Sequence, residues 1–223
     1  MLFETIGIDA RTALLLLGCL SLAISGWVFG LKFLKLGNHI LGYEYLIVGS
    51  SGLNFLFYNA TRYQLSYDLM IYLDAFSRAF GFPVLGTLGL IAVTHQFRVS
   101  TRTKVTLFVT TLGLTAVMLW SDFITPILPY FYLIVIYPFF LYLLYVVKKL
   151  FDIGRAGVGF FLLISTFASL IIATIYDFYT IPGEEINVVF NFFFLALVTW
   201  SASFVAMYYA YLALDEVRGT EDN

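Results

Sequence analysis

Residues 124–147 read ITPILPYFYLIVIYPFFLYLLYVV, a run without a single charged side chain. A helix needs roughly 20 mostly apolar residues to cross the hydrocarbon core of a bilayer, so this run predicts a transmembrane helix. The composition agrees, because 61% of the 223 residues are hydrophobic and 12% are charged, whereas soluble domains have about 45–50% and about 25%. Too little polar surface remains to coat a soluble globule. The sequence therefore predicts an integral membrane protein.

Six further apolar runs are separated by charged residues, prolines or glycines. The seven predicted spans cover residues 12–31, 40–60, 69–94, 105–120, 124–147, 158–176 and 186–212. None of them alternates strictly between apolar and polar residues, which argues against a β-barrel. We therefore predict an all-α membrane protein, a seven-transmembrane helix bundle that forms a single integral membrane domain over residues 1–223.

The basic residues fall almost entirely in one set of predicted loops. These are Lys32, Lys35, Arg98, Arg102, Lys104, Lys148, Lys149, Arg155 and Arg218. The opposite loops hold Arg11 and Arg62 and most of the acids: Glu4, Asp9, Asp68, Asp122, Asp177, Glu184 and Glu185. Because cytoplasmic loops are enriched in Lys and Arg, the N-terminus is predicted outside and the C-terminus in the cytoplasm. We expect a bacterial inner membrane, because the chain is short and its N-glycosylation context is limited to one weak match, which begins at Asn59.

Two segments resemble one another within the chain. Residues 31–37 (LKFLKLG) follow the first span, and residues 147–154 (VKKLFDIG) follow the fifth. One interpretation is a duplicated three-plus-one-plus-three arrangement of spans, as in many transporters. The other is that any two cytoplasmic helix ends collect lysine and glycine.

The third span contains the residues most informative about function, LDAFSRAFGFP at positions 73–83. Asp74 and Arg78 are four residues apart, so they lie on one helix face and can pair. A charge inside a span costs several kcal/mol unless it faces the bundle interior and finds a partner. The pair is therefore a predicted ligand or ion site. The alternative is an interfacial anchor in which Arg78 extends outward to the headgroups.

Three other residues are predicted to contribute to a ligand site. Pro83 frees backbone carbonyls within the third span, either to line a ligand or to let helices pack closely. Asn54 and Asn191 carry amides that are costly to bury in lipid without partners. All three are candidates for the lining of a solute site.

A metal or cofactor site has weaker support. His39 and His95 map to the cytoplasmic side. The two histidines could ligate a b-type haem, and together with Glu44 they could ligate a metal ion. No cofactor is predicted, and haem is kept as an alternative. Covalent retinal is disfavoured, because the last span, 186–212, contains no lysine. Metalloprotease, dithiol and phosphate-loop motifs do not occur in the sequence, so an enzyme is the less favoured interpretation.

Three functions follow from these observations. The favoured one is a carrier or channel for a small solute or ion, with Asp74 as the proton- or cation-sensitive group and Arg78 as its counter-ion or as an anion contact. The second is a membrane sensor or accessory subunit that binds a partner protein or lipid. The third is a haem-binding electron carrier. The expected partners are the lipid bilayer and a further copy of the chain or another membrane protein, and the net charge of −2 argues against nucleic acid.

Overall fold

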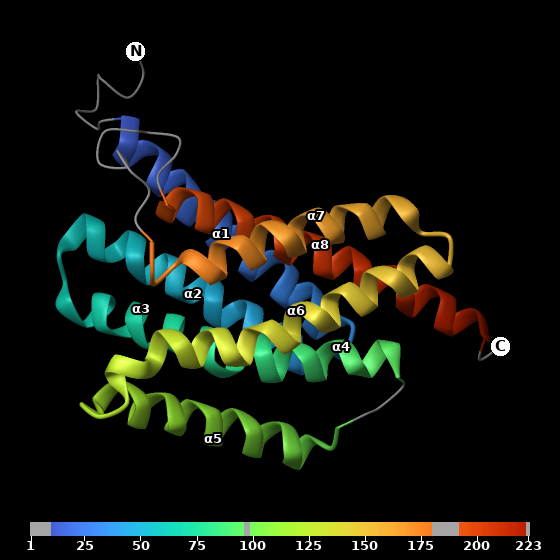
Figure 1. Ribbon diagram of the computed structural model, residues 1–223, viewed down its shortest axis with the longest axis horizontal. Helices are drawn as coiled ribbons and strands as arrows, with labels where there is room; N and C mark the ends of the chain where they lie inside the picture. Colours follow the sequence, from blue (N-terminus) through green and yellow to red (C-terminus); the bar gives the residue numbers. More distant parts are fainter. Residues whose placement is uncertain (1–9, 96–98, 180–191, 222–223) are drawn as a thin grey trace.

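The computed structural model describes residues 10–95, 99–179 and 192–221, which form helices and contain no strand (Figure 1). The helices are α1 (Ala10–Lys35), α2 (His39–Thr61), α3 (Gln64–Phe76), the π-helix η2 (Ser77–Gly86), α4 (Thr87–Thr94), α5 (Thr101–Trp120), the 3-10 helix η3 (Thr125–Ile127), α6 (Leu128–Asp152), α7 (Ala156–Ile175) and α8 (Phe192–Glu221). Because α3, η2 and α4 follow one another without a break, these elements give seven helical rods long and apolar enough to cross a membrane. The predicted all-helical fold with seven spans is confirmed.

Most helices extend beyond the predicted spans at their polar ends. The third rod begins at Gln64 instead of residue 69, and α5 begins at Thr101 instead of residue 105. Ser100 caps α5 by accepting a hydrogen bond from the Thr103 backbone N–H at 3.1 Å. The rod that corresponds to the fifth predicted span begins with η3 at Thr125 and continues through α6 to Asp152. Hydropathy locates only the apolar middle of each helix, whereas helical hydrogen bonding continues into the polar ends. Residues 186–191 of the last predicted span lie outside the described residues.

The helices run in alternating directions, with α5 at one side of the bundle (Figure 1). α1 packs along α2 and α8, α7 packs along α6 and α8, and α6 also contacts η2. α5 contacts α3 and η3, and Thr111 and Thr115 are its buried residues. The central part of the bundle therefore consists of the other six rods, and η2 lies within it.

Most of the described basic residues gather at one end of the bundle, which we call the basic end. Here α1, α4, α6 and α8 end, and α2, α5 and α7 begin. The basic residues near it are Lys32, Lys35, Arg102, Lys104, Lys148, Lys149, Arg155 and Arg218. Arg98, Glu4, Asp9, Glu184 and Glu185, which also entered the sequence argument, lie outside the described residues. The helix arrangement thus places the basic loops on one side, as the sequence predicted.

Two of the turns at the basic end have the same glycine cap. Gly37 and Gly154 have φ values of 76° and 75°, in the left-handed region that favours glycine. The residues that follow donate backbone hydrogen bonds back into the helix, Asn38 to Phe33 at 3.0 Å and Arg155 to Leu150 at 2.9 Å. This shared cap is what the second interpretation, of two similar helix ends, expects.

Glycines allow α1 and α2 to approach one another closely. A Cβ atom on Gly26 would lie 2.7 Å from the Gly49 Cα and from the Tyr45 carbonyl oxygen. A Cβ atom on Gly30 would lie 3.0 Å from the Gly42 carbonyl oxygen. Gly26 and Gly30 form a small-xxx-small pattern, which brings helix backbones together in membranes. This contact sets the position of α2, which faces η2 on its other side.

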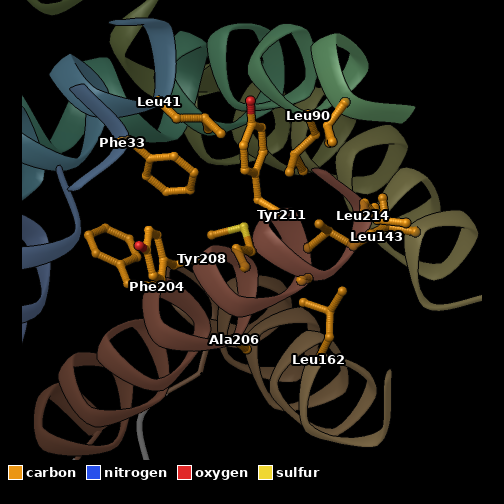
Figure 2. Packing of buried hydrophobic residues seen from close by; sticks show 14 of the residues in the cluster. Phe33, Leu41, Leu90, Leu143, Leu162, Phe204, Ala206, Tyr208, Tyr211 and Leu214 are labelled. Carbon is orange, nitrogen blue, oxygen red and sulfur yellow. The ribbon is translucent and has the colours of Figure 1, made fainter. Parts of the chain in front are cut away.

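An aromatic core fills the bundle between α1, α2 and α8 (Figure 2). Phe33 meets the rings of Tyr208 and Tyr211 edge to face, with centroids 5.2 and 5.3 Å away. The Tyr45 ring stacks on Phe204 at 4.1 Å, and its hydroxyl donates to the Phe204 carbonyl oxygen at 3.3 Å. These contacts hold α8 against α2 and fix one wall of the cavity described below.

Candidate functional site

The third rod contributes a charge cluster in which one guanidinium meets two carboxylates. Arg78 lies 3.7 Å from Asp74 on the same rod, so the predicted pair is formed. It also pairs with Asp177, which follows the end of α7. The exposed fractions of the Arg78, Asp74 and Asp177 side chains are 19%, 32% and 20%. The cluster thus has one more acidic than basic group and is largely shielded within the protein.

Two tyrosine rings complete this group of side chains. The Arg78 guanidinium carbon lies 4.1 Å from the ring centroid of Tyr132 on α6 and 4.6 Å from that of Tyr176. Such cation–π contacts gain strength where the cation is shielded from water. We call these five residues the Arg78 cluster. Its geometry favours an Arg78 side chain that points into the bundle over the outward-pointing anchor of the alternative prediction.

A cavity of about 110 Å³ lies inside the bundle beside the Arg78 cluster. A water molecule needs about 10–15 Å³ measured in this way, so the cavity has room for several waters or a small solute. Asp74, Arg78 and Tyr132 line it together with aromatic rings and hydroxyl groups. These further lining residues include Phe82, Phe139, Phe140, Trp200, Phe204, Ser51, Ser77, Ser169 and Ser203. The cavity therefore combines an apolar body with a few polar groups, as small-molecule sites do.

The serines at the cavity wall hold neighbouring helices together. Ser169 on α7 and Ser203 on α8 are 2.7 Å apart at their hydroxyl oxygens. The Ser51 hydroxyl on α2 donates to the Met70 carbonyl oxygen on α3 at 3.2 Å. Ser77 is buried on η2, and its hydroxyl makes no hydrogen bond. This hydroxyl is therefore available to a ligand or a water in the cavity.

Pro83 widens the third rod into the π-helix η2. π-Helical turns are rare and are frequently found at functional sites. The carbonyl oxygen of Pro83 accepts a hydrogen bond from the Thr87 hydroxyl at 2.7 Å. It is the preceding residue, Phe82, that lines the cavity. Pro83 thus lies in η2 next to the cavity wall without lining the cavity, and its two predicted roles stay predictions.

The two predicted asparagines do not join the cluster in the described structure. The Asn54 side-chain amide donates to the Ser50 carbonyl oxygen of its own helix at 2.9 Å, and Asn54 does not line the cavity. This local hydrogen bond satisfies the amide that was expected to need a ligand. Asn191 lies outside the described residues, so its predicted role is untested.

The predicted metal candidates have separate surroundings. His39 stacks on Tyr43 with ring centroids 6.2 Å apart. His95 hydrogen-bonds the Thr94 hydroxyl at 2.9 Å and stacks on Tyr145 at 5.6 Å. Among the described residues no group of three or more His, Cys, Asp or Glu side chains could hold a metal ion. The haem and metal hypotheses stay predictions, and an absorption spectrum of the purified protein tests the first.

Glu44 has an environment that the sequence analysis did not anticipate. Its side chain is 0% exposed, and neither carboxyl oxygen makes a hydrogen bond. It lies against Gly81 of η2, where a Cβ atom would overlap the carboxyl group. The sequence signal was an acidic residue within an apolar span, which was interpreted only together with His39 and His95. The structure places Glu44 behind the cavity wall.

Sequence reasoning also missed three members of the Arg78 cluster. Asp177 was counted among the acids of the loops, and Tyr132 and Tyr176 were not singled out as site residues. Tyr132 lies on α6, and Tyr176 and Asp177 follow the end of α7, so no spacing in the sequence links them to Arg78. The available signal was Arg78 itself, because a cation within a span attracts acidic and aromatic partners from neighbouring segments.

No family model, curated protein or solved structure matches this chain at a significant level. The assignment of class therefore rests on the chain itself. Seven long apolar helices indicate a polytopic integral membrane protein.

Proposed function

We propose that this protein is a carrier or channel for a small, positively charged solute, which binds in the cavity beside the Arg78 cluster. The observation that carries the proposal is a cavity of about 110 Å³ between the helices of the bundle that is lined by Asp74 and Arg78. A charged group within a membrane span is by default a functional site, because it is costly to keep there. A solute pathway is the function that uses both the cavity and the charges.

The preference for a cation follows from charge and ring chemistry. With both carboxylates ionised, Asp74 and Asp177 outnumber Arg78 as charges, so the cluster attracts positive charge. The cavity is also surrounded by aromatic rings, whose faces attract cations. A small organic cation satisfies both features, whereas an anion would gain only from Arg78, which already has two acidic partners.

The π-helix η2 is the proposed moving part. It provides Ser77, Arg78 and Phe82 to the cavity wall, and kinks in helices arise at prolines and π-turns. A change in the bend at Pro83 would move the guanidinium relative to Asp177 on α7. This motion would open or close the cavity at the end opposite the basic end.

A transport assay with defined probes tests the proposal. Proteoliposomes are given tetramethylammonium, guanidinium or acetate, and the uptake current is measured. We expect saturable currents with at least one cation and none with acetate. In the Asp74→Asn variant the cation current falls about tenfold, because one charge-assisted contact is lost.

Asp68→Asn is the matched control for this assay. Asp68 lies on α3 as well, but it is exposed and hydrogen-bonds Gln64 at 2.8 Å. We expect this variant to transport like the wild type. Equal currents in the Asp74→Asn and Asp68→Asn variants, or a preference for acetate, would contradict the proposal.

The proposed orientation places the N-terminus outside and the basic end in the cytoplasm, with a bacterial inner membrane as the proposed location. Cys19 is buried, so a Cys19→Ala background suits single-cysteine labelling. On intact bacterial cells a membrane-impermeant thiol reagent should label the Thr61→Cys variant, because residue 61 lies at the opposite end. The Ser100→Cys variant at the basic end should react only after the membrane is opened. The reverse pattern would show the opposite orientation.

A further inference from the structure

Glu44 is a buried acidic group that the proposed function does not use. Its side chain is fully buried on α2, and both carboxyl oxygens are without hydrogen bonds. Removing an ionised carboxylate from water costs several kcal/mol unless a cation or several donors compensate. The neutral, protonated carboxyl avoids most of this cost. Its surroundings therefore favour a bound proton.

The groups packed around Glu44 provide no compensating charge. On the η2 side its neighbours are Gly81 and the Ser77 hydroxyl, and the nearby Arg78 is engaged with Asp74 and Asp177. Among the described residues Glu44 forms no ion pair; the ion pairs are those of Arg78, Lys148, Arg155 and Arg218.

α3 packs against α2 and is joined to it by the hydrogen bond from the Ser51 hydroxyl to the Met70 carbonyl oxygen. Its acidic residues are Asp68, which is exposed, and Asp74, which pairs with Arg78.

The neighbours α1 and α4 approach α2 through uncharged groups. α1 faces it with Gly26, Gly30 and Trp27, and α4 faces Leu41 with Gly89. Asn38, at the start of α2, donates to the Gly89 carbonyl oxygen at 2.8 Å. None of these groups can neutralise a carboxylate at position 44.

Ser77 connects this carboxyl group with the cavity. Its hydroxyl lies beside Glu44, although neither group makes a hydrogen bond of ordinary geometry, and Ser77 also lines the cavity. The cavity is large enough for several waters. Water on the cavity side of Ser77 would be the nearest acceptor for a proton that leaves Glu44.

We propose that Glu44 is a proton-binding site inside the bundle, which exchanges its proton with cavity water past Ser77. On release, the carboxyl O–H bond breaks, its electron pair stays on the carboxylate, and the proton passes to water. The close contact of Glu44 with Gly81 couples this event to η2, because a new charge at the contact favours movement of η2 that admits water. The proposal holds whichever solute the cavity takes.

Infrared spectroscopy of the protein in lipid vesicles tests this site without any solute. A protonated carboxyl group has a C=O stretching band that ionised carboxylates lack. We expect such a band in the wild type at neutral pH, its downshift in heavy water, and its loss in the Glu44→Gln variant. The matched control, Asp68→Asn, should keep the band, and so should Asp74→Asn.

Two further variants keep the test decisive. Glutamine resembles a neutral glutamic acid in shape, so Glu44→Gln should fold and show a wild-type thermal midpoint. Ser77→Ala should keep the band and slow its shift in heavy water several-fold. If Glu44→Gln does not fold, Gly81→Ala serves instead, since its methyl group displaces the carboxyl group and should shift the band.

The result that would overturn the proposal is a band that is absent from the wild type, or unchanged in both Glu44→Gln and Gly81→Ala. Exchange that is equally fast in Ser77→Ala would overturn the route past Ser77. Loss of transport in the vesicle assay would not affect these readings. The failure of the proton site and the failure of the proposed transport function are thus distinguishable.

Discussion

The Arg78→Met variant is expected to lose about 2 kcal/mol of unfolding free energy, because this ion pair is partly buried and lies between exposed pairs, which contribute up to about 1 kcal/mol, and fully buried pairs, whose disruption costs about 3–5 kcal/mol. Methionine fills a similar volume but leaves Asp74 and Asp177 without their shared cation. It also removes the positive charge that lies over the rings of Tyr132 and Tyr176. Denaturant unfolding in detergent micelles, followed by tryptophan fluorescence, measures the change.

Lys148→Met is the matched control for this variant. Lys148 pairs with Asp152 at 3.0 Å, but both side chains are more than half exposed. Exposed pairs contribute little to stability, so this variant should differ from the wild type by less than about 0.5 kcal/mol. The double variant Arg78→Met with Asp177→Asn should recover part of the loss, since one unpaired carboxylate is removed. Equal stability of Arg78→Met and Lys148→Met would contradict the structural role of the Arg78 cluster.

The number of spans could be predicted because the bilayer imposes it on the sequence. A helix in lipid satisfies all its backbone hydrogen bonds internally and needs a fixed length of apolar residues. Both requirements are local, so they are visible in runs such as residues 124–147. The helix ends were less predictable, because polar residues such as Gln64 and Thr101 continue the helix outside the apolar run.

The charge pair in the third span was predictable for the same reason. Asp74 and Arg78 are separated by four residues, and helical geometry alone brings them together. Asp177 is 99 residues from Arg78 in the sequence, and only the packing of α7 on α6 and α8 brings it near. Local rules contain no information about this approach. The cluster was therefore found in part, and its second acid was missed.

Glu44 shows how a residue singled out in the sequence can have neighbours that the sequence does not indicate. An acidic residue in an apolar span was noticed, and the nearest metal-binding residue types were grouped with it. In the structure its carboxyl group lies against Gly81, which has no side chain. Because Gly81 has no side chain, it leaves room for the carboxyl group of Glu44. A single sequence does not indicate which glycine faces which acidic residue.

The Gly26→Leu variant is expected to lose roughly 3 kcal/mol of unfolding free energy, the upper end for overpacking. A side chain at position 26 would meet the backbone of α2 at Gly49 and Tyr45. Backbone cannot rotate out of the way as a side chain can, so α1 and α2 must separate along their length. The contact of α2 with η2 would then change as well. Denaturant unfolding measures the loss of stability, and the infrared band proposed for Glu44 reports any change at Gly81.

Gly113→Leu provides the control for a larger residue in a membrane helix. Gly113 lies in α5, and a Cβ atom there would meet nothing within 4 Å. Leucine forms helices better than glycine by up to about 1 kcal/mol, so this variant should be as stable as the wild type or slightly more stable. Because the same substitution meets backbone at position 26 and open space at position 113, the difference between the two measures the tight packing of α1 on α2. If both variants unfold alike, α1 and α2 do not pack through Gly26.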